Sequence, residues 1–399
     1  MGYLIKKRNL LRFNLSIRKL ALIAILTTFS AALIDTIWAI YLDSYLNSLT
    51  LVGFFSSALT FISFISFFLF IPMIEKKDKE KLYIFALVIS IFSYILFSFV
   101  EEIKAIFFLA LLLTLAINLR ISSWGIIVRD KSKRKELTKN EGILYTVYNA
   151  GWLIGPPVAG YIASRFNFKG VFFSAALILF IALILFVRFK IKDHKKTKHI
   201  DENVLKNFID FFKSKDRVVA YLLGGGGNFW WVLIYLFMPL YIVREGFGIF
   251  GLSIFFMAVL LPSVLFAYPF ARLASKIGHK KIFITGYAVL SAATLACFLL
   301  GNIYLIFAFL VIASIGISML ESTTEAYFFD ISTNEEVYRF FAPFNTSIDA
   351  NHLVAKFLPS VILIFLPFRF VFLFFGIFMI GFCVLATWTR NIIEARRKG

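Results

Sequence analysis

The chain has 399 residues, of which 60% are hydrophobic, and its mean hydropathy is +0.85. The apolar residues come in blocks of about 20, the length that crosses a hydrocarbon core of about 30 Å, which excludes an ordinary soluble domain. The net charge of +19 does not indicate nucleic acid, because the Lys and Arg residues fall mainly in alternate connections between the blocks. This positive-inside pattern predicts a plasma-membrane protein with both termini in the cytoplasm.

Twelve apolar blocks follow one another along the chain, and each is long enough to span a bilayer as an α-helix. In chain order they are Lys19–Leu42, Leu51–Met73, Leu82–Val100, Lys104–Val128, Gly142–Ser164, Gly170–Ile191, Arg217–Val243, Ile249–Ala271, Lys281–Leu300, Asn302–Tyr327, Phe341–Leu366 and Phe368–Trp388. The first block is too long for a cleavable signal peptide and lacks a small-residue cleavage site. We therefore predict an all-α membrane protein with twelve transmembrane helices.

A long basic connection at residues 191–216 divides the blocks into two sets of six. We predict an N-terminal six-helix bundle at 1–190 and a C-terminal one at 217–399. An Asp-x-Ser sequence recurs at the ends of the fourth and tenth blocks, at Asp130 and Asp330, which favours pseudo-symmetric bundles of a duplicated transporter. The later part of the connection has apolar residues at helical spacing. They fit either a helix along the membrane surface or one packed beneath the bundle.

The fifth block contains residues that ordinarily weaken a helix. Its stretch NAGWLIGPPVAGY, residues 149–161, holds three glycines and two adjacent prolines. Small residues at every fourth position form a ridge that lets another helix approach closely, and the eighth block carries a comparable ridge. The ridge residues are Gly151, Gly155, Ala159 and Ala163 in the fifth block, and Ser263, Ala267, Ala271 and Ser275 in the eighth.

This stretch resembles motif C of the major facilitator superfamily, G-x3-G-P-x-x-G-G, which lies in the fifth span of that family. Only the first glycine of the closing pair differs, as Ala159. The interface motif therefore consists of Gly151, Gly155, Pro156, Pro157 and Gly160. The resemblance implies that spans five and eight pack across the interface between the two bundles. Motif C is associated mainly with antiporters.

The loop after the eighth block resembles motif A of the same family, G-x-L-A-D-R-x-G-R-K. It begins near Arg272 and keeps the Lys276, Gly278 and Lys280 positions, but Ser275 stands where the family has Asp. The usual first copy of the motif, after the second block, keeps only charged residues. A conformational latch at that first copy is therefore not implied.

Seven ionisable residues lie inside the apolar blocks. Six charges facing lipid would cost on the order of 15–20 kcal/mol, more than the stability of a typical domain. These groups must therefore face a wet cavity, pair with one another or be neutral, which makes them candidates for transport and coupling. They are Asp35, Arg120, Glu321, Glu325, Asp349, His352 and Lys356.

The phasing of these residues predicts two polar stripes, Ser314, Ser318, Glu321 and Glu325 in the tenth block and Asn345, Asp349, His352 and Lys356 in the eleventh. Such groups would have interdependent proton affinities, and we expect Glu321 to be the coupling carboxylate. A static salt-bridge network between the two spans is the alternative. The resemblance places spans one, four, seven and ten around a central cavity. The depths of these residues along their spans then favour a contact between Arg120 and Glu321 or Glu325. Such a contact would form an inner gate.

Four consecutive glycines at Gly224–Gly227 make the seventh block easy to bend. Beyond them, Asn228, Trp231, Tyr235 and Met238 share one helix face. An aromatic and amide surface suits a bulky, partly apolar ligand, so this face is a candidate lining of the substrate cavity. Packing against neighbouring spans is the alternative.

Together these features favour a secondary transporter that works by alternating access, exporting a small organic compound in exchange for protons. The alternatives are a proton-coupled importer of sugars or organic ions, a non-transporting membrane sensor and an intramembrane enzyme, although no nucleophile or nucleotide-binding motif occurs. Cys297 and Cys383 lie inside apolar blocks and suit neither a disulfide nor a metal site. We expect no metal or cofactor, protons as coupling ion, a lipid bilayer and a small-molecule substrate as partners, and a monomer.

Overall fold

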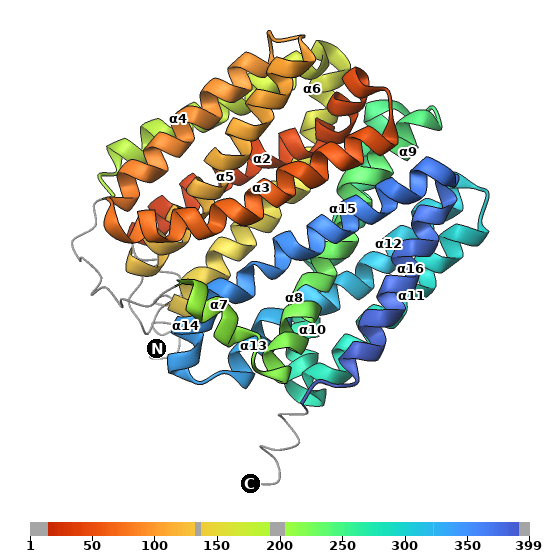
Figure 1. The fold of residues 1–399 in the computed structure, drawn as a ribbon. Helices are drawn as coiled ribbons and strands as arrows, with labels where there is room; N and C mark the ends of the chain where they lie inside the picture. The colour runs from red at the N-terminus through yellow and green to blue at the C-terminus, as the bar shows by residue number, and fades with distance from the viewer. Residues whose placement is uncertain (1–14, 132–136, 192–203, 322, 391–399) are drawn as a thin grey trace, which may run out of the picture. The chain divides into compact units, whose positions relative to one another are not determined.

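The structure is a computed structural model that describes residues 15–131, 137–191, 204–321 and 323–390 (Figure 1). The described part is helical and contains eleven helical segments long and apolar enough to cross a membrane. One of them, Ile143–Arg188, has 46 residues, about twice the length that a bilayer needs. It breaks at Asn167, where φ is +57°. This segment holds the fifth and sixth predicted spans, so the predicted all-α membrane fold is confirmed.

The helices form two compact units. The first comprises Met1–Ile34 with Leu69–Ile200, and the second comprises Asp35–Phe68 with Asp201–Gly399. Helices α2 (Leu15–Leu46) and α3 (Leu49–Lys76) therefore contribute one part to each unit. The division into bundles at 1–190 and 217–399 stays a prediction. Residues 192–203 of the connection between them, and both termini, lie outside the described residues.

The first unit contains α4 (Lys79–Phe97), α5 (Ile103–Lys131) and α6 (Leu137–Arg188), and α4 packs against both of the others. The break in α6 uses asparagine, which tolerates a left-handed backbone better than most residues. An ion pair of 2.9 Å between Lys169 and Glu101 joins the residues just after the break to the turn between α4 and α5. The carbonyl of Lys169 also accepts a hydrogen bond from Ser98. These contacts hold the hairpin of spans five and six against its neighbours.

The second unit contains three spans that are built from consecutive shorter helices. One span joins α8 (Lys215–Val232), the π-helical turn η1 (Leu233–Phe237) and α9 (Met238–Arg244). The second joins α12 (Ile303–Glu321) and α13 (Thr324–Ile331), and the third joins α14 (Asn334–Asn345) and α15 (Ser347–Phe365). The other helices of the unit are α7 (Val204–Phe211), α10 (Gly248–Ile277), α11 (His279–Leu299) and α16 (Arg369–Ala386).

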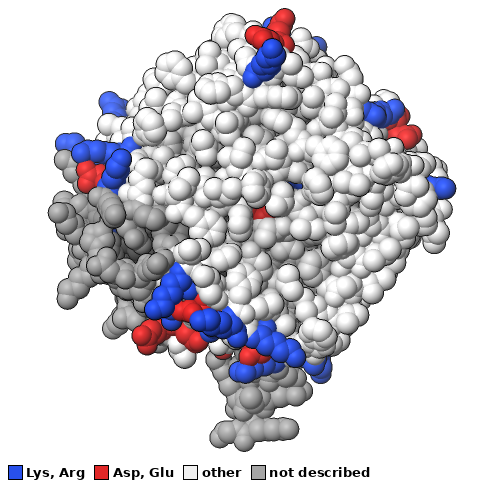
Figure 2. Space-filling model, in the orientation of Figure 1, with Lys and Arg blue, Asp and Glu red and all other residues white. Residues whose placement is uncertain are grey.

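The outer surface of these helices is apolar. Leu299, Phe365 and Tyr268 are each more than three-quarters exposed. Figure 2 shows charged side chains only in small groups, with broad uncharged areas between them. Such areas are much larger than the apolar patches of soluble monomers, so a lipid bilayer is the solvent that this surface fits.

Candidate functional site

Glu321 is the last residue of α12, and its carboxylate is held by a tryptophan of the seventh span. The indole N–H of Trp231 donates a hydrogen bond of 2.6 Å to Oε1 of Glu321. Ser263 of α10 lies near the same carboxylate, and its buried hydroxyl has no hydrogen-bond partner of normal geometry in the described part of the chain. The predicted coupling residue and one predicted cavity residue are thus in direct contact.

Tyr235 lies beside this pair, in the π-helical turn. Its ring is 5.5 Å from that of Trp231 and 5.0 Å from that of Phe256. Its hydroxyl is within electrostatic reach of both Glu321 and Asp35. Isolated π-helical turns are rare and frequent at functional sites. Asn228, Trp231 and Tyr235 are partly exposed while the residues between them are buried, so these three share one face, whereas Met238 is buried. That this face lines a substrate cavity stays a prediction.

A second group of charged residues follows α15. The Ser63 hydroxyl of α3 donates to the carboxylate of Asp349 at 3.2 Å, and the ammonium group of Lys356 donates to the Thr60 hydroxyl at 2.8 Å. The ammonium group of Lys356 also interacts electrostatically with the carboxylates of Asp349 and Asp35. The imidazole of His352 lies near the backbone of Asn228 and the charge of Lys356.

These contacts bring most of the predicted ionisable residues together within the second unit. Of the hydroxyls that complete the cluster, those of Thr60 and Ser63 were missed by the sequence analysis, which named Ser263 only as a ridge residue of the eighth block. A signal did exist for the two missed hydroxyls, because the second span carries hydroxyl residues at helical spacing: Ser56, Ser57, Thr60, Ser63 and Ser66.

The polar stripe predicted for the tenth span does not continue as one helix. Helix α12 ends at Glu321, and α13 begins at Thr324, so Glu325 is exposed on a separate helix. Ser314 and Ser318 are buried and donate to carbonyls of their own helix, Val311 and Ile315. In this span Glu321 is therefore the acid that joins the cluster.

The four glycines of the seventh span lie in unbroken α-helix, and the irregular turn comes one turn after them. They are positions of close approach. A Cβ at Gly225 would lie 1.8 Å from the side chain of Asn351, and one at Gly226 would lie 2.3 Å from the Tyr287 hydroxyl. That hydroxyl donates to the carbonyl of Leu223 at 2.7 Å.

In the first unit, the ridge of span five packs against α2. A Cβ at Gly155 would lie 2.3 Å from that of Ala32, and one at Gly151 would lie 3.1 Å from Thr28. The helix continues through Pro156 and Pro157. The contact between spans five and eight that the resemblance implies would join the two units and stays a prediction.

Arg120 of α5 is buried in the first unit, and its Nη1 has no hydrogen-bond partner among the described residues. The acids that we expect it to meet, Glu321 and Glu325, belong to the second unit. The proposed inner gate therefore stays a prediction.

The loop motif forms the turn between α10 and α11. Gly278 has φ +90°, a conformation that favours glycine, and its N–H donates to the carbonyl of Ala274. Arg272 and Lys276 are exposed, and Lys280 is half-buried. The motif also includes a contact that the sequence did not reveal, since the imidazole of His279 lies 3.1 Å from the carboxylate of Asp330.

Helix α7 is fixed to the second unit by two arginines. Arg217 contacts Glu336 at 2.9 Å and donates to the carbonyls of Asp210 and Phe211, while Arg339 contacts the carboxylate of Asp210. A hydrogen bond from Lys213 lowers the pKa of Asp210, and backbone bonding at Thr333 lowers that of Glu336.

The two faces of α7 differ, and the alternatives of a helix along the membrane surface or packed beneath the bundle stay predictions. Phe208 packs on Phe64 and Phe68 of α3, so one face is docked on the unit. Leu205 and Ile209 remain more than half exposed on the other face.

No group of three or more His, Cys, Asp or Glu side chains suited to a metal ion occurs within the residues that the structure describes. The candidate site consists of carboxylates, a lysine, a histidine, hydroxyls and aromatic rings. Such groups can exchange protons and bind a polar organic molecule.

A charge cluster inside a membrane-spanning helical fold is typical of one class of protein, the secondary transporters. The family model of the Major Facilitator Superfamily matches residues 20–261 and 249–399, so the chain belongs to that superfamily. Members of this family are transporters and not enzymes, which confirms the prediction on that point.

The chain is also similar to individual proteins. It is 27% identical to sugar efflux transporter B of Salmonella typhimurium, over 41% of this chain and 43% of that relative. The fold matches a POT family transporter bound to a thioalcohol-conjugated peptide, with a TM-score of 0.79 at 14% identity, over 93% of this chain and 95% of the other. It also matches the nucleoside transporter NupG, with a TM-score of 0.76 at 12% identity over 93% and 98%. At these identities the structures show the fold alone.

Proposed function

We propose that the protein exports a small organic compound by alternating access, in exchange for protons. Glu321 is the proposed coupling carboxylate, and Asn228, Trp231 and Tyr235 are the proposed cavity residues. The observation that carries this proposal is the hydrogen bond of 2.6 Å between Trp231 and Glu321, because it links the proton-binding group to the ligand-binding face.

This bond suggests how substrate and proton exclude each other. The indole N–H stabilises the charged form of Glu321, so the carboxylate gives up its proton when Trp231 is in place. A substrate that packs on Trp231 in this position keeps the bond and so favours loss of the proton, whereas a proton that neutralises Glu321 weakens the hold on Trp231 and so weakens substrate binding. By linkage the two effects are reciprocal, which is what exchange transport requires.

The other charged residues of the cluster have supporting roles in this proposal. Asp349, His352 and Lys356 hold a compensating charge next to α3, and Asp35 extends the acidic surface toward Tyr235. Arg120 and Glu325 are proposed to close the inner end.

Two observations support export, and one suggests a substrate class. The similar Salmonella protein is described as an efflux transporter, and the motif in span five is associated mainly with antiporters. That relative is described as acting on sugar, and aromatic rings beside amide and carboxylate groups suit a molecule with apolar faces and polar edges. A sugar is therefore the first substrate to test.

The test uses purified protein in liposomes that contain a pH-sensitive dye, with lactose and the aromatic cation ethidium as probes. Wild-type protein is expected to show substrate-driven proton movement. Glu321→Gln and Asp349→Asn are expected to abolish it. Glu102→Gln is the matched control, since Glu102 is an exposed acid outside the cluster.

The direction of an imposed pH gradient separates exchange from its main alternative, import together with protons. Vesicles with an acidic lumen accumulate substrate by exchange, whereas an acidic exterior drives import by symport. Substrate movement that ignores the gradient and is unchanged in Glu321→Gln would refute the coupling role.

We further propose a monomer in the plasma membrane with both termini in the cytoplasm. The charge distribution along the chain supports this orientation. Single cysteines placed at Glu102 and Lys213 in a variant that lacks Cys297 and Cys383 test it. An impermeant thiol reagent added to intact cells should label the first position and not the second.

A further inference from the structure

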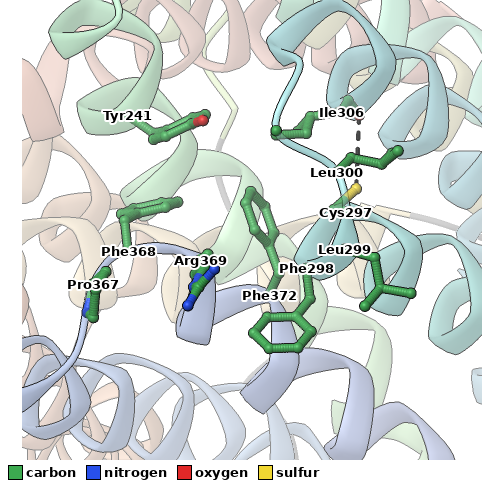
Figure 3. Close-up of a pocket in the computed structure, with 11 residues that line it drawn as sticks. Tyr241, Cys297, Phe298, Leu299, Leu300, Ile306, Pro367, Phe368, Arg369 and Phe372 are labelled. Atoms are coloured by element: carbon green, nitrogen blue, oxygen red, sulfur yellow. Dashed lines mark hydrogen bonds between the residues drawn. The ribbon is translucent and has the colours of Figure 1, made fainter.

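A pocket of about 340 Å³ lies in the second unit, and its lining shares no residue with the cluster around Glu321 (Figure 3). Its walls come from four segments: Tyr241 of α9, residues 297–301 at the end of α11, Ile306 of α12, and Pro367, Phe368, Arg369 and Phe372 around the start of α16. The rings of Tyr241 and Phe368 stack at 4.6 Å. The pocket is thus an aromatic cavity bounded by helix ends.

The lining of this aromatic cavity includes one cationic side chain, that of Arg369. Arg369 is exposed, and its guanidinium lies over the rings of Phe298 and Phe370, at 5.9 and 5.4 Å from their centroids. Among the described residues no acidic side chain forms an ion pair with it. A guanidinium held on aromatic faces keeps its N–H donors available in the ring plane for a phosphate or carboxylate.

The location of the pocket indicates which kind of anion would bind in it. It lies where α11 and α15 end and α16 begins, which is the level of lipid head groups for spans of this length. Its rim is apolar on the outside, since Leu299 lines the pocket and is 81% exposed. An occupant must therefore combine a negative group with hydrocarbon.

We propose that this pocket binds an anionic phospholipid of the surrounding bilayer. The phosphate lies against Arg369, and the glycerol and first acyl carbons lie among the rings of Tyr241, Phe298 and Phe372. A water-soluble phosphate ester shares the anionic chemistry but leaves the apolar rim uncovered. The proposal concerns a site apart from transport and does not depend on the direction or coupling of transport.

Native mass spectrometry of the full chain, loaded with phosphatidylglycerol or phosphatidylcholine, tests the proposal. Arg369→Gln should lower retention of phosphatidylglycerol about fivefold, the factor that corresponds to about 1 kcal/mol per basic side chain near a membrane surface. Arg165→Gln is the control for charge, because Arg165 is also exposed and lies outside the pocket.

A second variant tests the cavity itself. Gly301 lines the pocket, and a Cβ there meets no atom within 4 Å, so Gly301→Leu can fill the space without a clash at Cβ. It should lower retention of phosphatidylglycerol to a similar extent with no change in charge. Gly381→Leu, at another open glycine outside the pocket, is its control.

Unchanged retention in both pocket variants would overturn the proposal. Loss in Arg369→Gln with full retention in Gly301→Leu would assign the effect to surface charge and also overturn it. Soluble glycerol phosphate should not displace the lipid, and displacement at equal concentration would show that the hydrocarbon part is not recognised.

Discussion

Gly225 provides the sharpest test of how the seventh span is packed. An alanine Cβ at this position would lie 1.8 Å from Nδ2 of Asn351 and 2.6 Å from the backbone carbonyl oxygen of Ser347. The side chain of Asn351 can rotate away, but it would then lose its bond to that carbonyl. The backbone of α15 can move only together with its helix. Gly225→Ala is therefore expected to force α8 and α15 apart.

The size of the effect follows from two opposing terms. Replacing glycine by alanine inside a helix is favourable by about 1 kcal/mol. Overpacking a buried contact costs about 1–3 kcal/mol, and a rigid backbone neighbour places the cost at the upper end. We expect a net loss of about 2 kcal/mol, which lowers the melting temperature by about 4–8 °C for a unit of this size.

Gly227 is the matched control in the same helix. A Cβ there would meet only the flexible end of Ile317, at 3.0 Å. Gly227→Ala should therefore leave the melting temperature unchanged or raise it slightly. Thermal unfolding in detergent, followed by the loss of the monodisperse chromatographic peak, measures both variants. A Gly225→Ala protein that melts no earlier than Gly227→Ala would refute this account of the glycines as sites of close approach.

Other variants test the contacts of Trp231, α7 and Asn167. Trp231→Phe keeps a ring but removes the donor to Glu321, so the pH profile of transport should move toward higher pH; an unmoved profile would argue against the coupling role. Asp210 and Glu336 have lowered pKa values, so the stability that they give α7 is complete above their unfolded values of about 4 and is lost as pH falls further. Hydrogen exchange of residues 204–211 should rise below about pH 4, and equal protection at lower pH would contradict this. Asn167→Val should cost about 1–2 kcal/mol in thermal stability because φ is +57°, whereas Asn167→Gly should not.

The fold was largely predictable because its signal lies in block length. A span needs about 20 apolar residues whatever its neighbours are, so hydropathy alone marks where the helices lie. The breaks inside spans left no such signal. The π-helical turn at Leu233–Phe237 is as apolar as the residues around it, and only Pro239 just beyond it, which lacks the N–H that would bond to the carbonyl of Tyr235, could have indicated the irregularity; α12 ends at Glu321 without a proline in its sequence.

The charged residues of the site were predictable, but their partners were not. Burying a charge in a bilayer is so costly that Glu321, Asp349 and Lys356 stand out in any apolar block. Thr60 and Ser63 do not stand out, because a hydroxyl can bond to its own helix and then costs little. The sequence also does not tell whether a glycine lies at a bend or at a contact. Gly225 proved to be a contact, since the helix is regular there and a Cβ would meet α15.

Three members of the cluster in the second unit lie at or near points where its helices are interrupted, whereas Asp35, His352 and Lys356 lie inside regular helices. Glu321 ends α12, Tyr235 lies in the π-helical turn, and Asp349 follows the join between α14 and α15 by a few residues. At such points backbone groups leave the regular helical ladder, and a small change in backbone angles redirects a side chain without melting the span. A charge in mid-helix would need the whole span to turn before its surroundings changed. The positions of Glu321 and Asp349 at interruptions would let each one exchange an indole or hydroxyl partner for water while the helices on either side stay packed, which is the local change that the proposed proton-coupled alternating access requires.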